Sequence, residues 1–229
     1  MRTFEKQEFV RWHDRGGSLY EDMRFVNCWF RSCGISITRD PAQRTIVRNV
    51  ELIKCEERGG AIDTAVLEGL LVDGLKTTGL LQTWGAVFKH VTLRGRIGRI
   101  MVSPAVGTGL ATPEQQRAFD VANARYYADV DWALDIREAE FEECDIRRVP
   151  ASLVRRDPET QVVVTRERAL RGEWRRLDLS KTYWASAIEG FLHEGDADLV
   201  LVAGKRQRKF RDLVDGLKKL RDAGVAEPG

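Results

Sequence analysis

The chain has 229 residues, 43% of them hydrophobic, and its 37 Lys and Arg against 35 Asp and Glu give a net charge of +2. This length and composition suit one folded domain, or one domain with an appendage, and exclude a chain that is mainly disordered. The net charge is too small to make nucleic acid or a membrane an obligatory partner.

Targeting signals are not visible in the sequence. No apolar run reaches the roughly 18 to 20 residues of a membrane-spanning helix, and the start, MRTFEKQEFVRW, lacks the apolar core of a signal peptide. We therefore expect a cytoplasmic protein that does not contact a membrane. Because such a protein has no need of disulfides, its cysteines are expected to be free thiols. These cysteines are Cys28, Cys33, Cys55 and Cys144.

Residues 1–20 are predicted to form an N-terminal cap. Thr3 is an expected helix N-cap, and a short helix would end at Gly16 and Gly17. Three aromatic side chains of this segment would cover the structure that follows, namely Phe4, Phe9 and Trp12.

A period of five residues begins after the cap, and it is neither the helical period of 3.6 nor the strand period of 2. Large apolar residues recur every five positions, and a smaller residue stands two places before each of them. The pattern occurs between residues 23 and 37 and again between 134 and 151. Its large residues are Phe25, Phe30, Ile35, Ile136, Phe141 and Ile146. Two separate occurrences indicate a regular structure.

A second period of about twenty residues lies above the first. Aligning FVNCWFRSC, VRNVELIKC, VLEGLLVDG and FKHVTLRGR without gaps places large apolar residues in two columns and polar residues in a third. The apolar columns are Phe25, Val47, Val66 and Phe88, then Phe30, Leu52, Leu71 and Leu93, and the polar column is Asn27, Asn49, Glu68 and His90. Cys33 and Cys55 share a fourth column. We predict that the members of each apolar column stack inside the protein and that Cys33 lies against Cys55.

Together the two periods predict a mainly β protein, with a short right-handed parallel β-helix, or solenoid, whose coils stack about 4.8 Å apart. The pattern resembles that of the pentapeptide-repeat proteins, whose square right-handed β-helix carries a large apolar residue at the centre of each pentapeptide and a small one two positions earlier. The resemblance covers residues 23–37 and 134–151. It implies the architecture, and the family's functions do not follow from architecture alone.

The β-helix is predicted to span residues 21–151 and to carry a helical insertion at about 104–130. The segment ATPEQQRAFDVANARYYADVDW predicts a helix at 113–128. Thr112 is the expected N-cap, and Pro113 would take the first helical position.

Residues 152–229 are predicted to form a C-terminal α/β cap or appendage. Strands are expected at ETQVVVT and DADLVLVA, and helices at RERALRGEWRRL, KTYWASAIEGFLHEG and RKFRDLVDGLKKLRDAG. The last helix would end at Gly224. One face of it is apolar and should be buried, through Phe210, Leu213, Val214, Leu217 and Leu220.

Catalytic, phosphate-binding and metal-binding motifs are not assembled in the sequence, so no cofactor and no metal is expected and the catalytic residues are unknown. The cysteines and His90 are zinc-ligand types, but their spacing follows the coil period, which favours a structural role. The acidic run DIREAEFEECDIR, at 135–147, is either a solvated outer face or a set of acid and base groups.

The segment GKRQRKFRDLVDGLKKLR carries eight Lys or Arg against two Asp. It is either the solvated face of a helix or a site for weak contact with a polyanion. The candidate binding residues are Lys205, Arg206, Arg208, Lys209, Lys218 and Lys219.

Two functions remain open at this point. The first is a non-enzymatic protein-interaction module that presents a rigid β-helix surface to an unidentified protein partner. The alternative is a carboxylate-dependent enzyme that acts on a saccharide or another polymer along a β-helix face. Two carboxylates with raised pKa values and a basic group in one cleft would favour the enzyme. Some pentapeptide-repeat proteins imitate DNA with a strongly acidic rod, and a net charge of +2 argues against that role.

Overall fold

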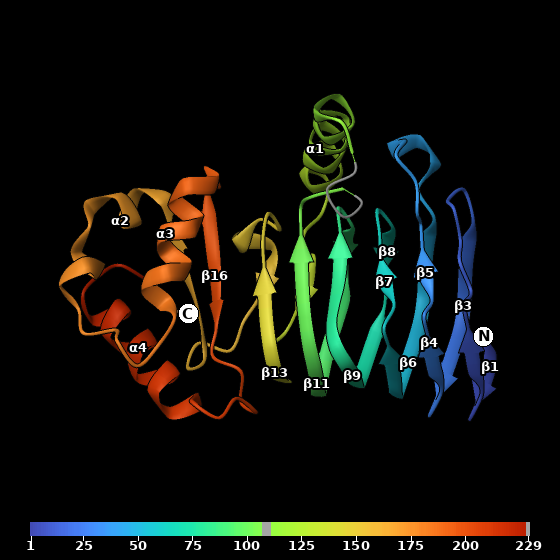
Figure 1. Ribbon diagram of the computed structural model, residues 1–229, viewed down its shortest axis with the longest axis horizontal. Helices are drawn as coiled ribbons and strands as arrows, with labels where there is room; N and C mark the ends of the chain where they lie inside the picture. Colours follow the sequence, from blue (N-terminus) through green and yellow to red (C-terminus); the bar gives the residue numbers. More distant parts are fainter. Residues whose placement is uncertain (107–110, 228–229) are drawn as a thin grey trace.

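The computed structural model describes residues 1–106 and 111–227, which are mainly β structure (Figure 1). Their 16 strands belong to one sheet with the order β1-β3-β6-β9-β11-β13-β16-β15. The strands stand side by side along the long axis of the molecule, from β1 near the N-terminus to β16. As far as β13 they are parallel and follow the order of the chain.

The strands before residue 156 make up what we call the parallel-strand region. They are β1 (Arg2–Glu5), β2 (Glu8–Val10), β3 (Leu19–Val26), β4 (Trp29–Arg31), β5 (Gly34–Ile35), β6 (Ile46–Arg58), β7 (Ala61–Ile62), β8 (Val66–Glu68), β9 (Leu71–Trp84), β10 (Val87–Lys89), β11 (Val91–Ser103), β12 (Leu134–Asp135), β13 (Ala139–Ile146) and β14 (Val154–Arg155).

Parallel pairing in this region joins residues that are 19 to 27 positions apart, or 43 to 44 positions apart where residues 104–133 intervene. Arg2 pairs with Met23, an offset of 21. Leu19 pairs with Ile46, an offset of 27, and Ile46 pairs with Val66, an offset of 20. The period of about twenty residues in the sequence is therefore the interval between neighbouring strands.

The five-residue period has a backbone cause. Asp22, Asn27 and Ser32 have φ of 55°, 51° and 51°, in the left-handed region that few non-glycine residues adopt. A residue in this conformation every five positions redirects the chain at regular intervals. Phe25 and Cys28 lie between these bends and are both buried. The large apolar positions of the five-residue pattern and the positions two places before them thus both face the core.

The two predicted apolar columns are wrong by five residues at their first step and by one residue at the later steps. Phe25 pairs with Leu52, not with Val47, and Leu52 pairs with Val72 rather than Leu71. The loop at 36–45, which holds the 3-10 helix η1 (Pro41–Gln43), lengthens this interval to 27 residues. An ungapped alignment with an offset of 22 could not include that loop.

The same loop displaces the predicted cysteine and polar columns. Cys28, not Cys33, lies against Cys55. The pairing of Trp29 with Glu56 and the hydrogen bond from the N–H of Glu56 to the Cys28 carbonyl, at 2.9 Å, set this register. All four cysteines are free thiols. Asn49 donates a hydrogen bond to Asp22 rather than stacking on Asn27.

Residues 2–10 form β1 and β2 rather than the predicted N-terminal helix. Phe4 pairs with Phe25, and Phe9 with Phe30, with ring centroids 5.0 Å and 5.3 Å apart. Lys6, between the two strands, has a φ of 51°. The spacing of five between Phe4 and Phe9 continues the period of the later strands, and the packing of these rings outweighs the local helix signal at Thr3.

Helix α1 (Pro113–Ala128) confirms the predicted helix. Thr112 caps it by accepting the N–H of Gln115 at 3.3 Å, and the Gln115 side chain accepts the N–H of Thr112 at 2.9 Å. The helix projects from one side of the sheet (Figure 1). Strand register continues across it, since Val91 pairs with Leu134. The part of the predicted insertion at 107–110 lies outside the described residues.

The region after residue 155 has a different construction, and we call it the C-terminal region. Its strands are antiparallel, and β16 meets β13 at the pair of Val200 with Ile146. Its elements are β15 (Gln161–Thr165), α2 (Arg166–Arg171), η4 (Glu173–Arg176), α3 (Trp184–Glu194), β16 (Asp198–Val202) and α4 (Phe210–Asp222). They confirm the predicted strands and helices, except that the second half of RERALRGEWRRL is the 3-10 turn η4.

Each region has its own hydrophobic core. The first lies inside the parallel-strand region and includes Val200 of β16. The second lies under α3 and α4 and includes Leu199 and Leu201 of the same strand. Side chains alternate along a strand, so one face of β16 closes the first core while the other supports the helices. Among the described residues, no helix is long and apolar enough to cross a membrane.

Candidate functional site

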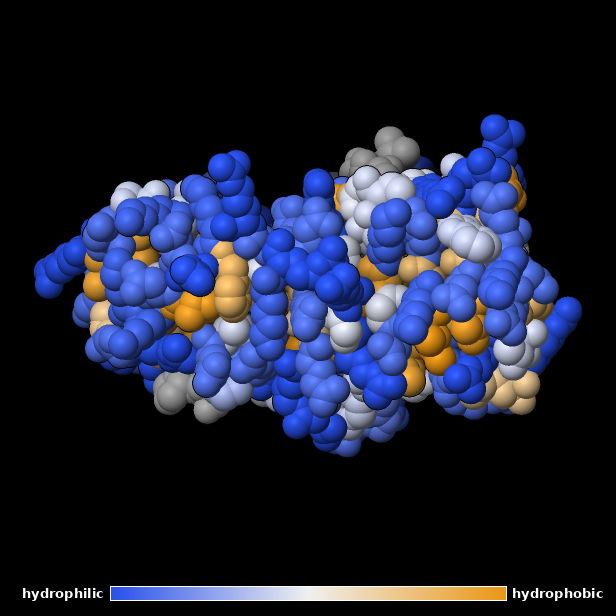
Figure 2. Space-filling model, turned by 90° about the horizontal axis from the view of Figure 1, so that it is seen from below, coloured by the Kyte–Doolittle hydropathy of each residue, from blue (hydrophilic) through white to orange (hydrophobic). Residues whose placement is uncertain are grey.

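An apolar cavity of about 180 Å³ lies inside the parallel-strand region. Side chains from successive strands form its wall, among them Phe30, Leu52, Ile62, Leu81, Leu93 and Ile146. Figure 2 shows the molecule from below, where apolar atoms reach the surface between charged side chains in the part that β6 to β9 occupy. Its apolar wall offers water few hydrogen-bond partners, so the space can take up an apolar group.

The cavity coincides with a change of side chain in one stacked column. Phe30 pairs with Glu57, and Glu57 pairs with Thr77. A large aromatic ring is therefore followed by a carboxylate side chain and then by a small hydroxyl side chain. Phe30 and Glu57 line the cavity, whereas Thr77 does not, and its hydroxyl accepts the N–H of Arg99 at 2.8 Å.

Glu57 is the one acidic side chain in the described cavity wall. It is 7% exposed, and burial raises its pKa, while hydrogen bonds from the backbone N–H groups of Gly60 and Gly59 act in the opposite direction. The carboxylate thus holds the bend at 59–60, where Gly59 has a φ of 74°. A single carboxylate in this role cannot supply the acid and base pair of a hydrolase.

Charged side chains surround the same bend on the outside. Glu56, beside Glu57 and on the opposite face of the strand, accepts from Arg58 at 2.9 Å and from Lys76 at 3.2 Å. These paired charges lie on the outer face of the strands, opposite the cavity.

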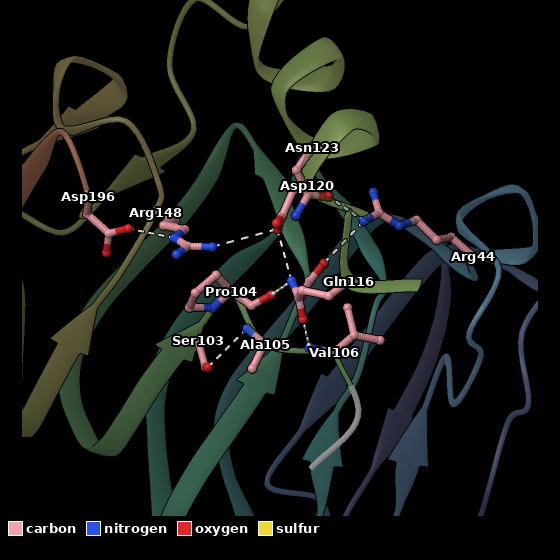
Figure 3. Close-up of polar contacts among 11 residues, drawn as sticks. Arg44, Ser103, Pro104, Ala105, Val106, Gln116, Asp120, Asn123, Arg148 and Asp196 are labelled. Carbon is pink, nitrogen blue, oxygen red and sulfur yellow. Dashed lines mark hydrogen bonds and ion pairs between the residues drawn. The ribbon is translucent and has the colours of Figure 1, made fainter. Parts of the chain in front are cut away.

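A polar network attaches helix α1 beside the parallel strands (Figure 3). The side chain of Gln116 accepts the N–H of Val106 at 2.9 Å and donates to the Pro104 carbonyl at 3.0 Å. It also donates to Asp120 at 2.9 Å. The helix is therefore fixed to the end of β11 through its own first turns.

Arg44 makes the second attachment of α1. Its guanidinium donates to the Asn123 side chain and, at 3.3 Å, to the Gly85 carbonyl, and it lies 4.8 Å from the ring centroid of Phe119. Burial lowers its pKa to about 10, and its Nε is buried without a hydrogen-bond partner among the described residues. Arg44 therefore joins α1 to the loop before β6 and to the residue that follows β9.

A cleft of about 360 Å³ lies between β13, β16 and α3. Burial raises the pKa values of Asp145 and Asp198 in its wall, and Arg147 lines the same cleft. This combination meets the condition that would favour the enzyme.

The two acidic groups nevertheless belong to opposite faces of the sheet. Ile146 and Val200 are paired, and both side chains enter the first core. Asp145 is one residue from Ile146 and points away from that core, whereas Asp198 is two residues from Val200 and points to the same side as Val200. Asp145 accepts from Arg147 at 2.9 Å and Asp198 from the N–H of Ala151 at 3.1 Å. They are not placed to act on one bond.

The six candidate basic residues do not form one patch. Lys205 to Lys209 precede α4 instead of occupying its first turns, and Lys218 and Lys219 lie about 15 Å further along it, at 1.5 Å per residue. Lys205 pairs with Asp157 at 3.0 Å, and Lys219 with Asp215 at 2.9 Å. The predicted apolar face of α4 is buried or half-buried as expected.

His90 and the acidic run have local partners. The His90 ring is 2.6 Å from Asp131 and stacks on Trp132 with centroids 4.7 Å apart. In the acidic run Arg137 pairs with Asp135 at 2.6 Å. Among the described residues no group of three or more His, Cys, Asp or Glu side chains could hold a metal ion.

Sequence reasoning missed Glu57 although a signal was present. Cys55 is one of the small residues of the five-residue pattern, so a large apolar residue is expected two places later. Position 57 carries a carboxylate instead. The cavity and the attachment of α1 depend on register and on contacts between distant segments, which the sequence does not display. Comparison with known proteins finds no matching family model, no matching curated protein and no matching solved structure.

Proposed function

We propose that this protein is a non-enzymatic protein-interaction module, in which a short right-handed β-helix of the pentapeptide-repeat type presents a rigid surface and takes an apolar side chain of its partner into the cavity. The cavity of about 180 Å³ among successive parallel strands is the observation that carries the proposal. Offsets of 20 to 27 residues support one coil per interval. Connections between parallel strands are right-handed in almost all proteins, which supports the hand.

Size and chemistry favour a side chain over a polar substrate. Cavities of about 150 Å³ hold a benzene ring, so this one has room for a single aromatic or aliphatic side chain. Its wall offers an incoming molecule almost no polar group, whereas small-molecule sites place a few polar groups to fix orientation. An apolar anchor in a pocket surrounded by charged side chains is typical of protein interfaces.

A rigid scaffold supports the same function. Parallel strands from β1 to β13 hydrogen-bond to their neighbours in turn, and α1 is fixed to them by Gln116 and Arg44. Binding to a preorganised surface costs little conformational entropy in the receptor. The free thiols at all four cysteines support a cytoplasmic location, where disulfides are rare.

The carboxylate-dependent enzyme is the second candidate. The raised pKa values of Asp145 and Asp198 beside Arg147 in the 360 Å³ cleft favour it. The opposite orientation of the two carboxylates argues for the interaction module instead. Hydrolysis of a polysaccharide that is lost in both Asp145→Asn and Asp198→Asn variants would reverse this order.

Filling the cavity tests the proposed function. Ala61, in the cavity wall, is replaced by Leu, and the matched control is Ala118→Leu on the exposed side of α1. Proteins bound to the immobilised chain in a lysate of its source are quantified by mass spectrometry. We expect at least one protein to bind the unmodified chain and the control equally and to bind Ala61→Leu about tenfold less, a difference near 1.4 kcal/mol.

Circular dichroism establishes that both variants are folded. If the unmodified chain, Ala61→Leu and Ala118→Leu captured every lysate protein equally, the proposal would be contradicted. If Ala61→Leu does not fold, Leu81→Phe, which fills the cavity from another strand, replaces it in the comparison.

A further inference from the structure

The first strands of the parallel-strand region are paired on one side only. Within residues 1–106 and 111–227, β1 pairs with β3, β2 pairs with β4, and His13 forms a bridge to Gly34. The backbone groups on the other side of these strands have no strand partner in the described structure. An edge of this kind is a template for pairing with another chain.

Apolar side chains accompany this edge. Phe9 lies 6.0 Å from Trp12, and Trp12 lies 5.1 Å from Tyr20, between ring centroids. The most exposed large hydrophobic side chains of this segment are Met1 at 59%, Val10 at 46%, Trp12 at 39% and Leu19 at 52%. Together β1, β2 and these residues form what we call the first-strand surface. Terminal units of repeat structures need a polar cap to avoid such exposure.

We propose that the first-strand surface binds the same surface of a second copy of this chain, in a closed dimer with two-fold symmetry. At the other end of the parallel strands, β13 pairs with β16, which carries the C-terminal region. Of the parallel strands at that end, only the two-residue strand β14 is left with a single partner in the described structure, so head-to-tail growth has little edge to pair with, while a two-fold contact uses one surface twice and closes. The two-fold rotation reverses the strand direction, so β1 and β2 would meet their partners in antiparallel pairs.

Charge complementarity favours a second copy over a strongly charged partner. The charged residues of this surface alternate in sign along the chain, as Arg2, Glu5, Lys6, Glu8 and Arg11. All five are exposed. Three basic and two acidic groups let a copy of the same surface meet opposite charges, whereas a uniformly acidic or basic partner would meet like charges. No proline, the common block to edge pairing, occurs before Pro41.

Sedimentation equilibrium of the full chain tests the dimer. We expect a monomer–dimer equilibrium with a Kd of the order of 1 to 10 µM, and the double variant Val10→Lys with Leu19→Lys should raise that Kd about 100-fold or more. The matched control is Val121→Lys with Leu170→Lys, which changes two side chains that are 66% and 63% exposed elsewhere. The control should leave the Kd unchanged.

Amide hydrogen exchange gives a second readout without any substitution. Amides of residues 2–10 should exchange more slowly at a protein concentration of about 100 µM than at about 1 µM, because the dimer protects the edge. A monomer at 100 µM, or an equal rise in Kd in the control variant, would overturn the proposal. So would exchange at residues 2–10 that does not depend on concentration. Ala61→Leu lies outside this surface, so failure of the dimer and failure of the cavity proposal are separate results.

Discussion

The two hydrophobic cores differ in how completely they are filled. The core of the C-terminal region contains Trp184 at 1% exposure and Leu217 at 0%, packed between helices and one face of β16. The core of the parallel-strand region surrounds a cavity of about 180 Å³, and wall residues such as Leu52 are only half-buried. Both cores consist mainly of aliphatic side chains, so composition alone does not explain the difference.

Backbone geometry explains it. Helices place side chains at several heights and directions, so that neighbours interdigitate and a small residue can be compensated by a large one. Stacked parallel strands place equivalent residues directly against each other, so the succession from Phe30 to Glu57 to Thr77 has no neighbour that can move in. A stack of strands therefore retains an apolar cavity within its core, whereas the free volume beside the C-terminal core is the partly polar cleft of about 360 Å³ that Trp184 and Phe191 line.

The largest expected difference between the cores is in stability. Leu217→Ala should lower the free energy of unfolding by about 3 to 5 kcal/mol, because it opens a new cavity in a filled core. Leu81→Ala in the cavity wall should cost about 2 kcal/mol, because a side chain beside a void has fewer contacts to lose. Urea unfolding of both variants provides the comparison. An equal cost at the two sites would mean that the parallel-strand core is filled.

A smaller effect concerns the buried carboxylate beside the cavity. The native pKa of Glu57 is raised above the ordinary value of 4.5, so the folded state holds this proton more tightly than the unfolded state. The stability it contributes is complete below pH 4.5 and is lost as pH rises through the native pKa. The unfolding free energy of the unmodified chain should therefore fall, relative to Glu57→Gln, as pH rises from about 4 to 7.

Glu56→Gln is the matched control for that titration. The hydrogen bond from Arg58 lowers the pKa of Glu56, so this carboxylate stabilises the fold above the ordinary carboxyl pKa and loses that effect as pH falls through its native pKa. The unmodified chain should gain stability relative to Glu56→Gln as pH rises over the same range. If the stability of the unmodified chain relative to Glu57→Gln and relative to Glu56→Gln changed in the same direction with pH, Glu57 would not be buried as described.

The smallest effect is expected from the basic residues before α4. Replacing Lys205, Arg206, Arg208 and Lys209 by Gln should remove a weak binding of DNA or RNA, with a Kd of the order of 10⁻⁴ to 10⁻⁶ M at physiological salt. The melting temperature should barely change, because exposed charges contribute little to stability. Lys218→Gln with Lys219→Gln is the control and should retain binding in a salt titration followed by fluorescence anisotropy. Loss of binding in the control alone would place the contact on α4 itself.

Local signals made the C-terminal region and α1 predictable. The apolar face of Leu213, Leu217 and Leu220 identifies α4 without knowledge of its neighbours, and Thr112 marks the start of α1. The five-residue period likewise predicted the parallel strands. Their register was not predictable in the same way, because it depends on the length of the loop at 36–45, which leaves no periodic mark.

The site was less accessible to sequence reasoning than the fold. Glu57 breaks the apolar track and could have been noticed, but a cavity is a property of several strands in register. The cleft with Asp145 and Asp198 shows the converse problem. Both residues are acidic and line the same cleft as Arg147, and only the pairing of Ile146 with Val200 reveals that they lie on opposite faces of the sheet.

Diffraction from a crystal under xenon pressure tests the central claim most directly. Xenon enters apolar cavities of about this size without requiring a polar contact. We expect xenon density in the parallel-strand region, within contact of Leu52, Leu81 and Leu93, and none around Leu213 and Leu217 in the core of the C-terminal region. The Ala61→Leu variant should lose that density. An interior of the parallel strands that takes up no xenon in the unmodified protein would contradict the account.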